Sequence, residues 1–448
     1  MRRACLLLAA ASAAAAAVAA SPAAPVLIGP QPFVNARDPP FYRSLDPPQA
    51  ARARLGHAVF NTQWTAAGTP GAARIDGLGP LYNAASCDEC HNEGAAARGP
   101  LGDGPAPQGL VVQLQLPTAA NANAPLQGDP RYGQVLNTVA LSPLQPEAQV
   151  RIVYQPLRGH YPDGTPWQLR VPRYVLGALR YGPLSAQTLI KPRLAPALFG
   201  DGLLQAVPAS AILAPGPPAQ AGLPAWQWID GRRELGRFGW QGASLSIRDQ
   251  TGKALAREMG LTNPAYPQDD CTPAERDCRA QPNGGDPEVA ASLFDALVAF
   301  QSWLAVPAAP GHEGSVERVR GARLFRQIGC AACHRPQLPV VLPAAHGTLR
   351  RARIAAYTDL RLHDLGAALA DHDAAGAVVP SRWRTAPLWG LGYRLGRERQ
   401  LTLLHDGRAL SIEQAILWHG GEAASARQRF EQLPRATRRA LLQWLGSL

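Results

Sequence analysis

Two cysteine–histidine motifs hold the side chains best suited to chemistry. Cys87-Asp88-Glu89-Cys90-His91 and Cys330-Ala331-Ala332-Cys333-His334 both follow the pattern C-x-x-C-H. Two thiols at this spacing can form thioethers with the two vinyl groups of one haem, and the adjacent imidazole reaches the iron. A redox-active thiol pair would not need the histidine, and a zinc site would need a second pair of ligands nearby. The spacing therefore predicts two covalently bound haem c groups, with His91 and His334 as axial iron ligands.

Three further cysteines lie outside these motifs. Cys5 lies in an apolar N-terminal stretch, and neither Cys271 nor Cys278 is followed by a histidine. In an oxidising compartment two such close cysteines form a short-loop disulfide, and a catalytic dithiol is the alternative. The sequence therefore predicts a disulfide between Cys271 and Cys278.

The N-terminus has the features of an export signal. Arg2 and Arg3 precede an alanine-rich apolar stretch over residues 4–20, which ends in the small-residue pattern of a cleavage site. This stretch is short for a membrane anchor, and no later segment is long and apolar enough to span a bilayer. We therefore expect residues 1–20 to be a signal peptide. The mature chain is expected to be periplasmic, not membrane-spanning, and without a nucleic-acid partner.

The composition is typical of a folded protein with many loops. Of the 448 residues, 46% are hydrophobic, and there are 43 glycines and 43 prolines. The formal net charge is +11, and only two of the 44 basic residues, Lys191 and Lys253, are lysines. Haem propionates would neutralise part of this charge. The remainder either favours docking of an acidic electron donor or simply gives a basic surface.

Helix signals surround both motifs. Apolar periodicity predicts helices over residues 49–64, 287–304, 315–327, 411–418 and 434–445. Gly56 and Gly321 occupy matching places in the two helices that lead into the motifs, where a residue without Cβ lets another helix approach closely. The C-terminal helix is expected to pack against the helix over 315–327.

The rest of the chain predicts two halves of unequal size. Alternating apolar residues near 112 and 169, with the turn signal Asp163-Gly164, predict a β insertion over about 106–180. We expect a mainly α fold of two cytochrome c-like domains. The N-terminal haem c domain would span 21–310 and carry this insertion and long loops, and the C-terminal domain would span 311–448.

Further segments carry a family resemblance. They are Arg237–Trp240, Glu258–Thr262, Tyr357–Gly366 and Leu404–Arg408. These segments resemble the di-haem oxidoreductase family, whose members are described as peroxidases and sometimes as thiol oxidoreductases, and the resemblance covers nearly all of the mature chain. Through Arg384–Trp389 the second half is also similar to bacterial di-haem cytochrome c peroxidases and the methylamine-utilisation di-haem enzyme. The resemblance implies two haems that exchange electrons, one of which meets peroxide.

The sixth iron ligands are less clearly marked. An electron-transfer haem takes Met or His, whereas a peroxide-reducing haem needs an open or displaceable position. Met259 is the one methionine of the mature chain, and it lies in the first half. In the second half His405 and His363 lie in the resembling segments and rank ahead of Tyr393 and His419. The alternatives are a core position for Met259, and hydrogen bonds to a propionate or a carbonyl for the histidines.

Peroxide cleavage also needs a group that moves a proton and a cation or dipole that stabilises charge. By residue type, His57, Glu147 and His160 are candidates for proton transfer, and Trp240 for an electron relay between the haems. Each is also explained as a surface or structural residue, so no catalytic residue is assigned.

The function predicted from these features is that of a periplasmic di-haem c-type oxidoreductase resembling cytochrome c peroxidases. It would take electrons from a small periplasmic cytochrome c or cupredoxin and pass them to peroxide. The alternatives are a pure electron-transfer di-haem cytochrome, and a di-haem oxidase or oxygenase that acts on another substrate.

Overall fold

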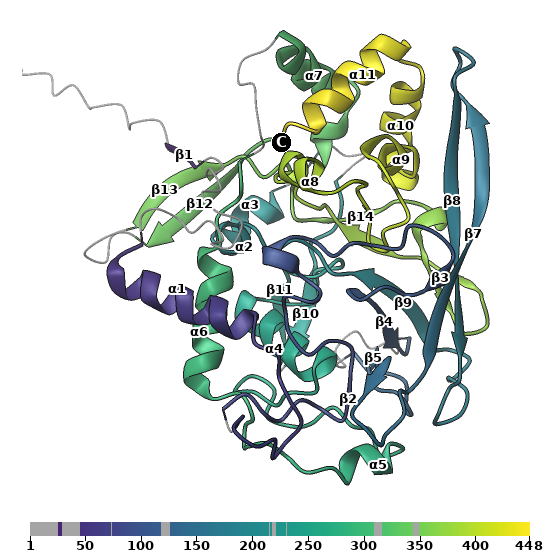
Figure 1. Cartoon of the computed structure of the whole chain (residues 1–448). Helices are drawn as coiled ribbons and strands as arrows, with labels where there is room; N and C mark the ends of the chain where they lie inside the picture. The colour runs from purple at the N-terminus through teal and green to yellow at the C-terminus, as the bar shows by residue number, and fades with distance from the viewer. Residues whose placement is uncertain are drawn as a thin grey trace, which may run out of the picture.

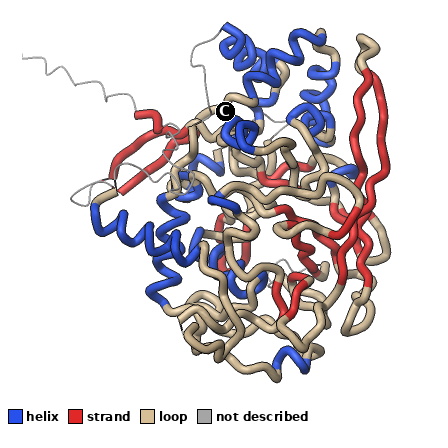
Figure 2. Tube along the Cα trace, viewed as in Figure 1, coloured by secondary structure: helices blue, strands red, loops and turns tan. Residues whose placement is uncertain are grey.

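The computed structural model describes residues 26–28, 45–72, 74–117, 126–214, 216, 221–229, 231–308, 316–343 and 349–448. The expected signal peptide and the expected boundary at residue 310 lie outside these residues. Helices and strands account for 29% and 23% of the chain. Runs of helices and runs of strands follow one another along the chain, and long loops join them (Figure 2). The prediction of a mainly α fold made of two cytochrome c-like domains is therefore wrong.

The helices gather at two places in the fold (Figure 1). They are α1 (Pro47–Phe60), α2 (Asp201–Gln205), α3 (Ala209–Leu213), α4 (Ile247–Glu258), α5 (Arg276–Arg279), α6 (Ala291–Trp303), α7 (Val316–Gln327), α8 (Leu391–Arg397), α9 (Ile412–Leu417), α10 (Ala424–Glu431) and α11 (Arg435–Leu445). The helices expected near 49–64, 315–327, 411–418 and 434–445 are confirmed. The helix expected from 287 begins later, at Ala291, and α10 was not predicted.

The described strands are mostly short and form small sheets. One sheet contains β1 (Val26–Ile28), β13 (Leu349–Ile354) and β12 (Leu338–Pro343), and another β16 (Val378–Val379), β15 (Asp371–Asp373), β9 (Leu189–Leu194), β4 (Leu110–Gln115) and β5 (Val135–Leu136). A third contains β3 (Gly104–Pro105), β7 (Gln149–His160) and β8 (Pro166–Gly177). The remaining pairs are β2 (Leu81–Tyr82) with β6 (Val139–Ala140), β10 (Trp226–Ile229) with β11 (Arg232–Leu235), and β14 (Leu362–Asp364) with β17 (Arg382–Arg384).

The five-stranded sheet joins the two parts of the chain. Strand β9 pairs with β4 on one side and with β15, almost 180 residues later, on the other. In this register Gln113 lies opposite Lys191, and His372 lies opposite Ile190. Antiparallel partners that lie directly opposite each other point to the same face of a sheet. The sheet therefore aligns side chains from both parts of the chain on one face.

The hairpin β7–β8 confirms the expected β structure after the first motif. Twelve residue pairs join its strands, from Gln149 with Gly177 to His160 with Pro166. At its tip the hydroxyl of Tyr161 donates to Glu413 Oε1 at 2.7 Å, and the Arg438 guanidinium lies 3.6 Å from the Tyr161 ring centre. The hairpin runs alongside the C-terminal helices (Figure 1) and so holds them against the first part of the chain.

Two helix pairs, α1 with α6 and α7 with α11, each pack closely at a glycine. A Cβ at Gly56 of α1 would lie 1.9 Å from the carbonyl oxygen of Ala296 in α6. A Cβ at Gly321 of α7 would lie 2.2 Å from the Cβ of Trp444 in α11. Both contacts are closer than any side chain allows, so both glycines let the helix backbones approach. The expected packing of the C-terminal helix on α7 is confirmed.

Gly56→Ala is expected to destabilise the protein by about 2–3 kcal/mol, because α1 and α6 must separate to admit the new methyl group. The higher helix propensity of alanine offsets only about 1 kcal/mol of this cost. Gly102→Ala is the control, since a Cβ at Gly102 meets no atom within 4 Å. The measurement is the urea midpoint of unfolding. Equal midpoints for the two variants would contradict this account of the helix contact.

Candidate functional site

The first motif places His91 in a fixed orientation. Its ring Nδ1 donates a hydrogen bond to the carbonyl oxygen of Pro196 at 2.8 Å. Burial lowers the pKa of His91 to about 4, so the ring is neutral at pH 7. With the proton held on Nδ1, Nε2 carries the lone pair. This is the arrangement that a protein uses to orient a metal-ligating imidazole.

The second motif repeats the same arrangement with different partners. The ring Nδ1 of His334 donates to the carbonyl oxygen of Tyr357 at 2.9 Å. Burial, followed by the charge of His419, lowers the pKa of His334 to about 4. Both motif histidines therefore present a neutral Nε2 as a ligand, although their carbonyl partners come from unrelated segments.

The cysteines divide as their spacing predicts. Cys271 and Cys278 form a disulfide. Each of the four motif cysteines is half-buried and has a free thiol. Burial raises the pKa of both Cys87 and Cys330 to about 12, so these thiols are protonated at neutral pH.

A cavity of about 290 Å³ opens beside the second motif. Cys330, Cys333 and His334 form part of its wall, and α9 contributes Ile412, Ala415 and Ile416. Most of the other lining side chains are apolar, as in sites that bind a large flat cofactor. The same cavity extends to Pro196, whose carbonyl holds His91, so it reaches from the second motif toward the first.

The ring of His419 lies near that of His334, and both residues line this cavity. The two ring centres lie 6.5 Å apart, and the ring planes make an angle of 48°. Two imidazoles bound axially to one metal ion have ring centres about 6 Å apart, from two metal–nitrogen bonds of about 2 Å and two half-rings. The Nδ1 of His419 donates to the carbonyl of Ala415 at 2.7 Å, which leaves Nε2 for a ligand.

The two histidines that sequence position favours as sixth ligands have other partners. Both ring nitrogens of His363 are engaged, Nε2 by Asp359 Oδ2 at 3.0 Å and Nδ1 by Glu422 Oε2 at 2.8 Å. Burial opposes the charged form, but hydrogen bonds with Asp359 and with the Cys333 sulfur raise the pKa of His363 to about 10, which keeps it a cation without a free lone pair. His405 stacks on Trp383 with ring centres 3.8 Å apart. Neither arrangement favours iron ligation, whereas that of His419 does.

The other two ligand candidates lie with the first motif. Met259 is 3% exposed and belongs to a core against which Cys87 packs. Tyr393 lies in the same core, with its ring edge-on to Phe199 at 5.5 Å. Tyr393 thus belongs to the surroundings of the first motif, although its place in the sequence predicts the second.

Glu258, next to Met259, is a functional candidate that sequence reasoning missed. Burial raises the pKa of its carboxyl to about 7. Burial, followed by the charge of Glu258, raises the pKa of the Cys90 thiol to about 12. The side chain of Asn83 donates to Glu258 Oε2 at 3.1 Å. The carboxyl is thus fixed near the first motif and can gain or lose a proton near neutral pH. Its only signal in the sequence is its place in a family-like segment.

The catalytic candidates named from residue type lie in different places. His57 stacks on Phe300 at the end of α1, and His160 is exposed at the end of β7. Glu147 is buried away from the cavity and hydrogen-bonds Glu275, which together with burial raises its pKa. Trp240 lines the cavity, and its Nε1 donates to the carbonyl of Leu194 at 2.7 Å. Of these four residues, the described cavity wall includes Trp240 alone.

Two buried donors on the cavity wall point to an anionic ligand. Within the described residues, Nη1 of Arg384 and Nε1 of Trp383 have no hydrogen-bond partner, although both side chains are buried. Unsatisfied buried donors of this kind are costly unless a ligand accepts from them. Haem propionates are acceptors of the required charge. The site therefore fits haem in three respects. It has paired thiols, it has neutral imidazoles close to each other, and it has buried hydrogen-bond donors without an acceptor.

These features define a haem-binding oxidoreductase type of site, and comparison with known proteins specifies the family. Residues 229–448 match the family described as "Di-haem oxidoreductase, putative peroxidase", and through this part the chain belongs to that family. The family name specifies two haems, and the chain has two C-x-x-C-H motifs. The match includes the second motif, His363, His405 and His419, whereas the first motif lies before it.

The remaining comparisons add less. The chain is similar in structure to one from "Kuenenia stuttgartiensis Hydrazine Synthase Pressurized with 20 bar Xenon", with 14% identity and a TM-score of 0.31. That similarity covers 58% of this chain and 73% of the other. No curated protein matches the chain. In the described part of the chain, no helix has the length and apolar character needed to cross a membrane.

Proposed function

We propose that this protein is an exported, periplasmic di-haem c-type oxidoreductase that reduces peroxide. The observation that carries the proposal is the shared geometry of His91 and His334, each buried, neutral and held through Nδ1 by a backbone carbonyl. Cys87 and Cys90 would hold the first haem, and Cys330 and Cys333 the second. A haem iron with an open position binds and reduces peroxide, whereas a six-coordinate haem transfers electrons.

The second site is proposed to transfer electrons. His334 and His419 would hold the iron of this haem, because both line the cavity and their ring centres lie 6.5 Å apart. Arg384 and Trp383 would donate to propionate oxygens. A small cytochrome c or cupredoxin would supply electrons from outside, and the basic net charge favours an acidic donor.

The first site is proposed to meet peroxide. Here Met259 fills the core, and a haem held by Cys87, Cys90 and His91 would supply the iron that reacts with peroxide. Glu258, held by Asn83, would give its proton to the leaving oxygen of peroxide, which departs as water. Two electrons and two protons convert each peroxide into two waters. Trp240 lines the cavity, and it would serve as an electron relay between the two haems.

The proposal is tested with protein made in cells that attach haem c. Wild type is expected to carry two haems that survive denaturation, and Cys330→Ala with Cys333→Ala to carry one. Wild type should oxidise reduced cytochrome c when peroxide is added. Noncovalent haem would refute the attachment. Two intact haems without peroxide turnover would instead favour a pure electron-transfer protein or an oxidase with another substrate.

A further inference from the structure

One buried lysine of the five-stranded sheet has no role in the proposed chemistry. Lys191 on β9 is 9% exposed, and its Nζ donates to Gln115 Oε1 on β4 at 2.7 Å. Within the described residues Lys191 forms no ion pair. Continuing the register of β9 with β15 by one position places Asp371 opposite Lys191. A lysine buried in this way is expensive unless its charge or its proton is used.

The choice of lysine matters in a chain that uses arginine almost everywhere. Lys191 and Lys253 are the two lysines among 44 basic residues. Arginine stays charged inside proteins, whereas a buried lysine can lose its proton. Burial, followed by the charge of Arg193, lowers the pKa of Lys191 to about 7, and Asp371 opposes this change. Lys191 can therefore exchange a proton at neutral pH.

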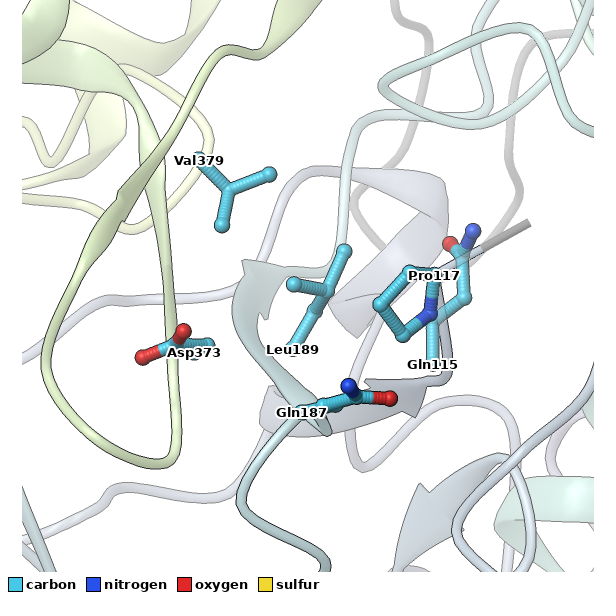
Figure 3. Close-up of a pocket in the computed structure, with 6 residues that line it drawn as sticks. All are labelled: Gln115, Pro117, Gln187, Leu189, Asp373 and Val379. Atoms are coloured by element: carbon cyan, nitrogen blue, oxygen red, sulfur yellow. The ribbon is translucent and has the colours of Figure 1, made fainter. Parts of the chain in front are cut away.

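Lys191 has a short connection to solvent. Its acceptor Gln115 lines a surface pocket of about 420 Å³, together with Pro117, Gln187, Leu189, Asp373 and Val379. Figure 3 shows these side chains around the pocket, with Asp373 and Val379 across from Gln115 and Pro117. The Lys191 amine thus lies one hydrogen bond away from a side chain that lines the pocket, so water in the pocket can approach it closely.

On its other side Lys191 is coupled to the cavity. Arg193 and Asp371 form a buried bidentate pair, with both N–O distances 2.8 Å. The Arg193 guanidinium lies 4.7 Å from the centre of the Trp383 ring, which stacks on His405. Trp383 and His405 both line the cavity of the second motif. Buried charges in this row interact strongly because little water screens them.

We infer that Lys191 is a redox-linked proton site: its amine binds one proton from solvent when one electron enters the neighbouring cavity. The inference rests on the proposed function, which places a haem in that cavity. The added electron makes the cavity more negative, so it favours the ammonium form of Lys191. The charges are then balanced, since one electron arrives from the donor and one proton arrives through the pocket.

The surrounding groups leave Lys191 as the responsive one. On its own strand Lys191 lies beside Arg193, which stays charged. From β15 it faces Asp371. Burial acts to raise the pKa of Asp371, but the charge of Arg193 outweighs burial and lowers that pKa to about 2. From β4 it faces Gln113 and Gln115, which do not titrate. His372 occupies the alternate position of β15 and points to the other face of the sheet. Asp373, two residues after Asp371 on the same face, adds a second carboxyl group beside the pocket. Among these neighbours Lys191 is the group whose pKa lies near neutral.

The test is the midpoint potential of the second haem between pH 5 and 9, for the haem-loaded protein. In wild type the potential should fall as pH rises through about 7, by about 59 mV in total if reduction raises the proton affinity of Lys191 tenfold. Lys191→Arg should remove this fall and hold the potential near the acid value of wild type. Lys191→Met should also remove it, but near the alkaline value. Lys253→Arg is the matched control and should behave as wild type.

The outcomes separate this inference from the proposed function. Loss of covalent haem, or of a low-spin spectrum in wild type, refutes the proposed function. Intact spectra with the wild-type slope retained in Lys191→Arg refute the inference alone, as does a flat wild-type potential. If both Lys191 variants fail to fold, Gln115→Leu removes the hydrogen bond to Nζ and should move the pH at which the potential falls. An unmoved pH would again refute the inference.

Discussion

His419→Gly should convert the second haem, about half of the total haem, from low spin to high spin, while His334 and the covalent attachment remain. The reason is geometric, because the two ring centres lie 6.5 Å apart and each ring has its Nδ1 bound to a carbonyl. Loss of one imidazole leaves that iron five-coordinate and raises its potential, since a strong sixth ligand favours the oxidised metal. The measurement is optical and paramagnetic resonance spectroscopy of the oxidised and half-reduced protein. Added imidazole should restore the low-spin signal by filling the space.

Two further histidine variants distinguish this assignment from the one that sequence position favours. His363→Gln and His405→Gln should both keep the low-spin signal, because His363 already binds two carboxylates and His405 stacks on Trp383. If His405→Gln or His363→Gln produces the high-spin form and His419→Gly does not, the assignment of His419 is wrong. His419→Met should instead retain a low-spin iron with a thioether ligand.

The same histidines show what can be predicted from the sequence at this site. Local spacing alone predicts the covalent and proximal positions, because Cys, Cys and His lie within five consecutive residues. A sixth ligand depends on which segment folds back over the opposite face, and the sequence contains no local signal for that. His419 is positioned by α9 and by its hydrogen bond to the carbonyl of Ala415. His363 lies in a more recognisable segment, but both of its ring nitrogens form hydrogen bonds with Asp359 and Glu422.

The fold likewise contains elements that local sequence patterns predict and elements that they do not. Helices α1, α7 and α11 follow from helical patterns of residues in the sequence. The β insertion follows from alternation near residues 112 and 169 together with the turn signal Asp163-Gly164. The strands beyond residue 180 contain two to six residues, too few for a period of two to be visible. Strand β9 also contains Pro192, which is uncommon within a sheet. These strands form through pairing with distant partners, so a mainly α fold was the wrong conclusion.

Glu258→Gln should lower the rate of peroxide reduction by about 10²–10⁴, the usual contribution of a general acid or base. The wild-type rate should fall as pH rises through about 7, because burial raises the pKa of Glu258 to about 7 and only the protonated carboxyl can supply a proton. The variant should lose this pH dependence. Its haem content and spectra should not change, since glutamine can still accept the hydrogen bond from Asn83.

The matched control is Glu147→Gln, another buried carboxyl with a raised pKa. Glu147 accepts a hydrogen bond from the backbone N–H of Asn137 and interacts with Glu275, away from the cavity. Its amide variant should therefore keep the wild-type pH profile. If Glu147→Gln loses the profile and Glu258→Gln keeps it, the assignment of Glu258 is wrong and Glu147 controls the proton supply. If both keep it, neither carboxyl is the acid, and a group outside the first motif must donate the proton.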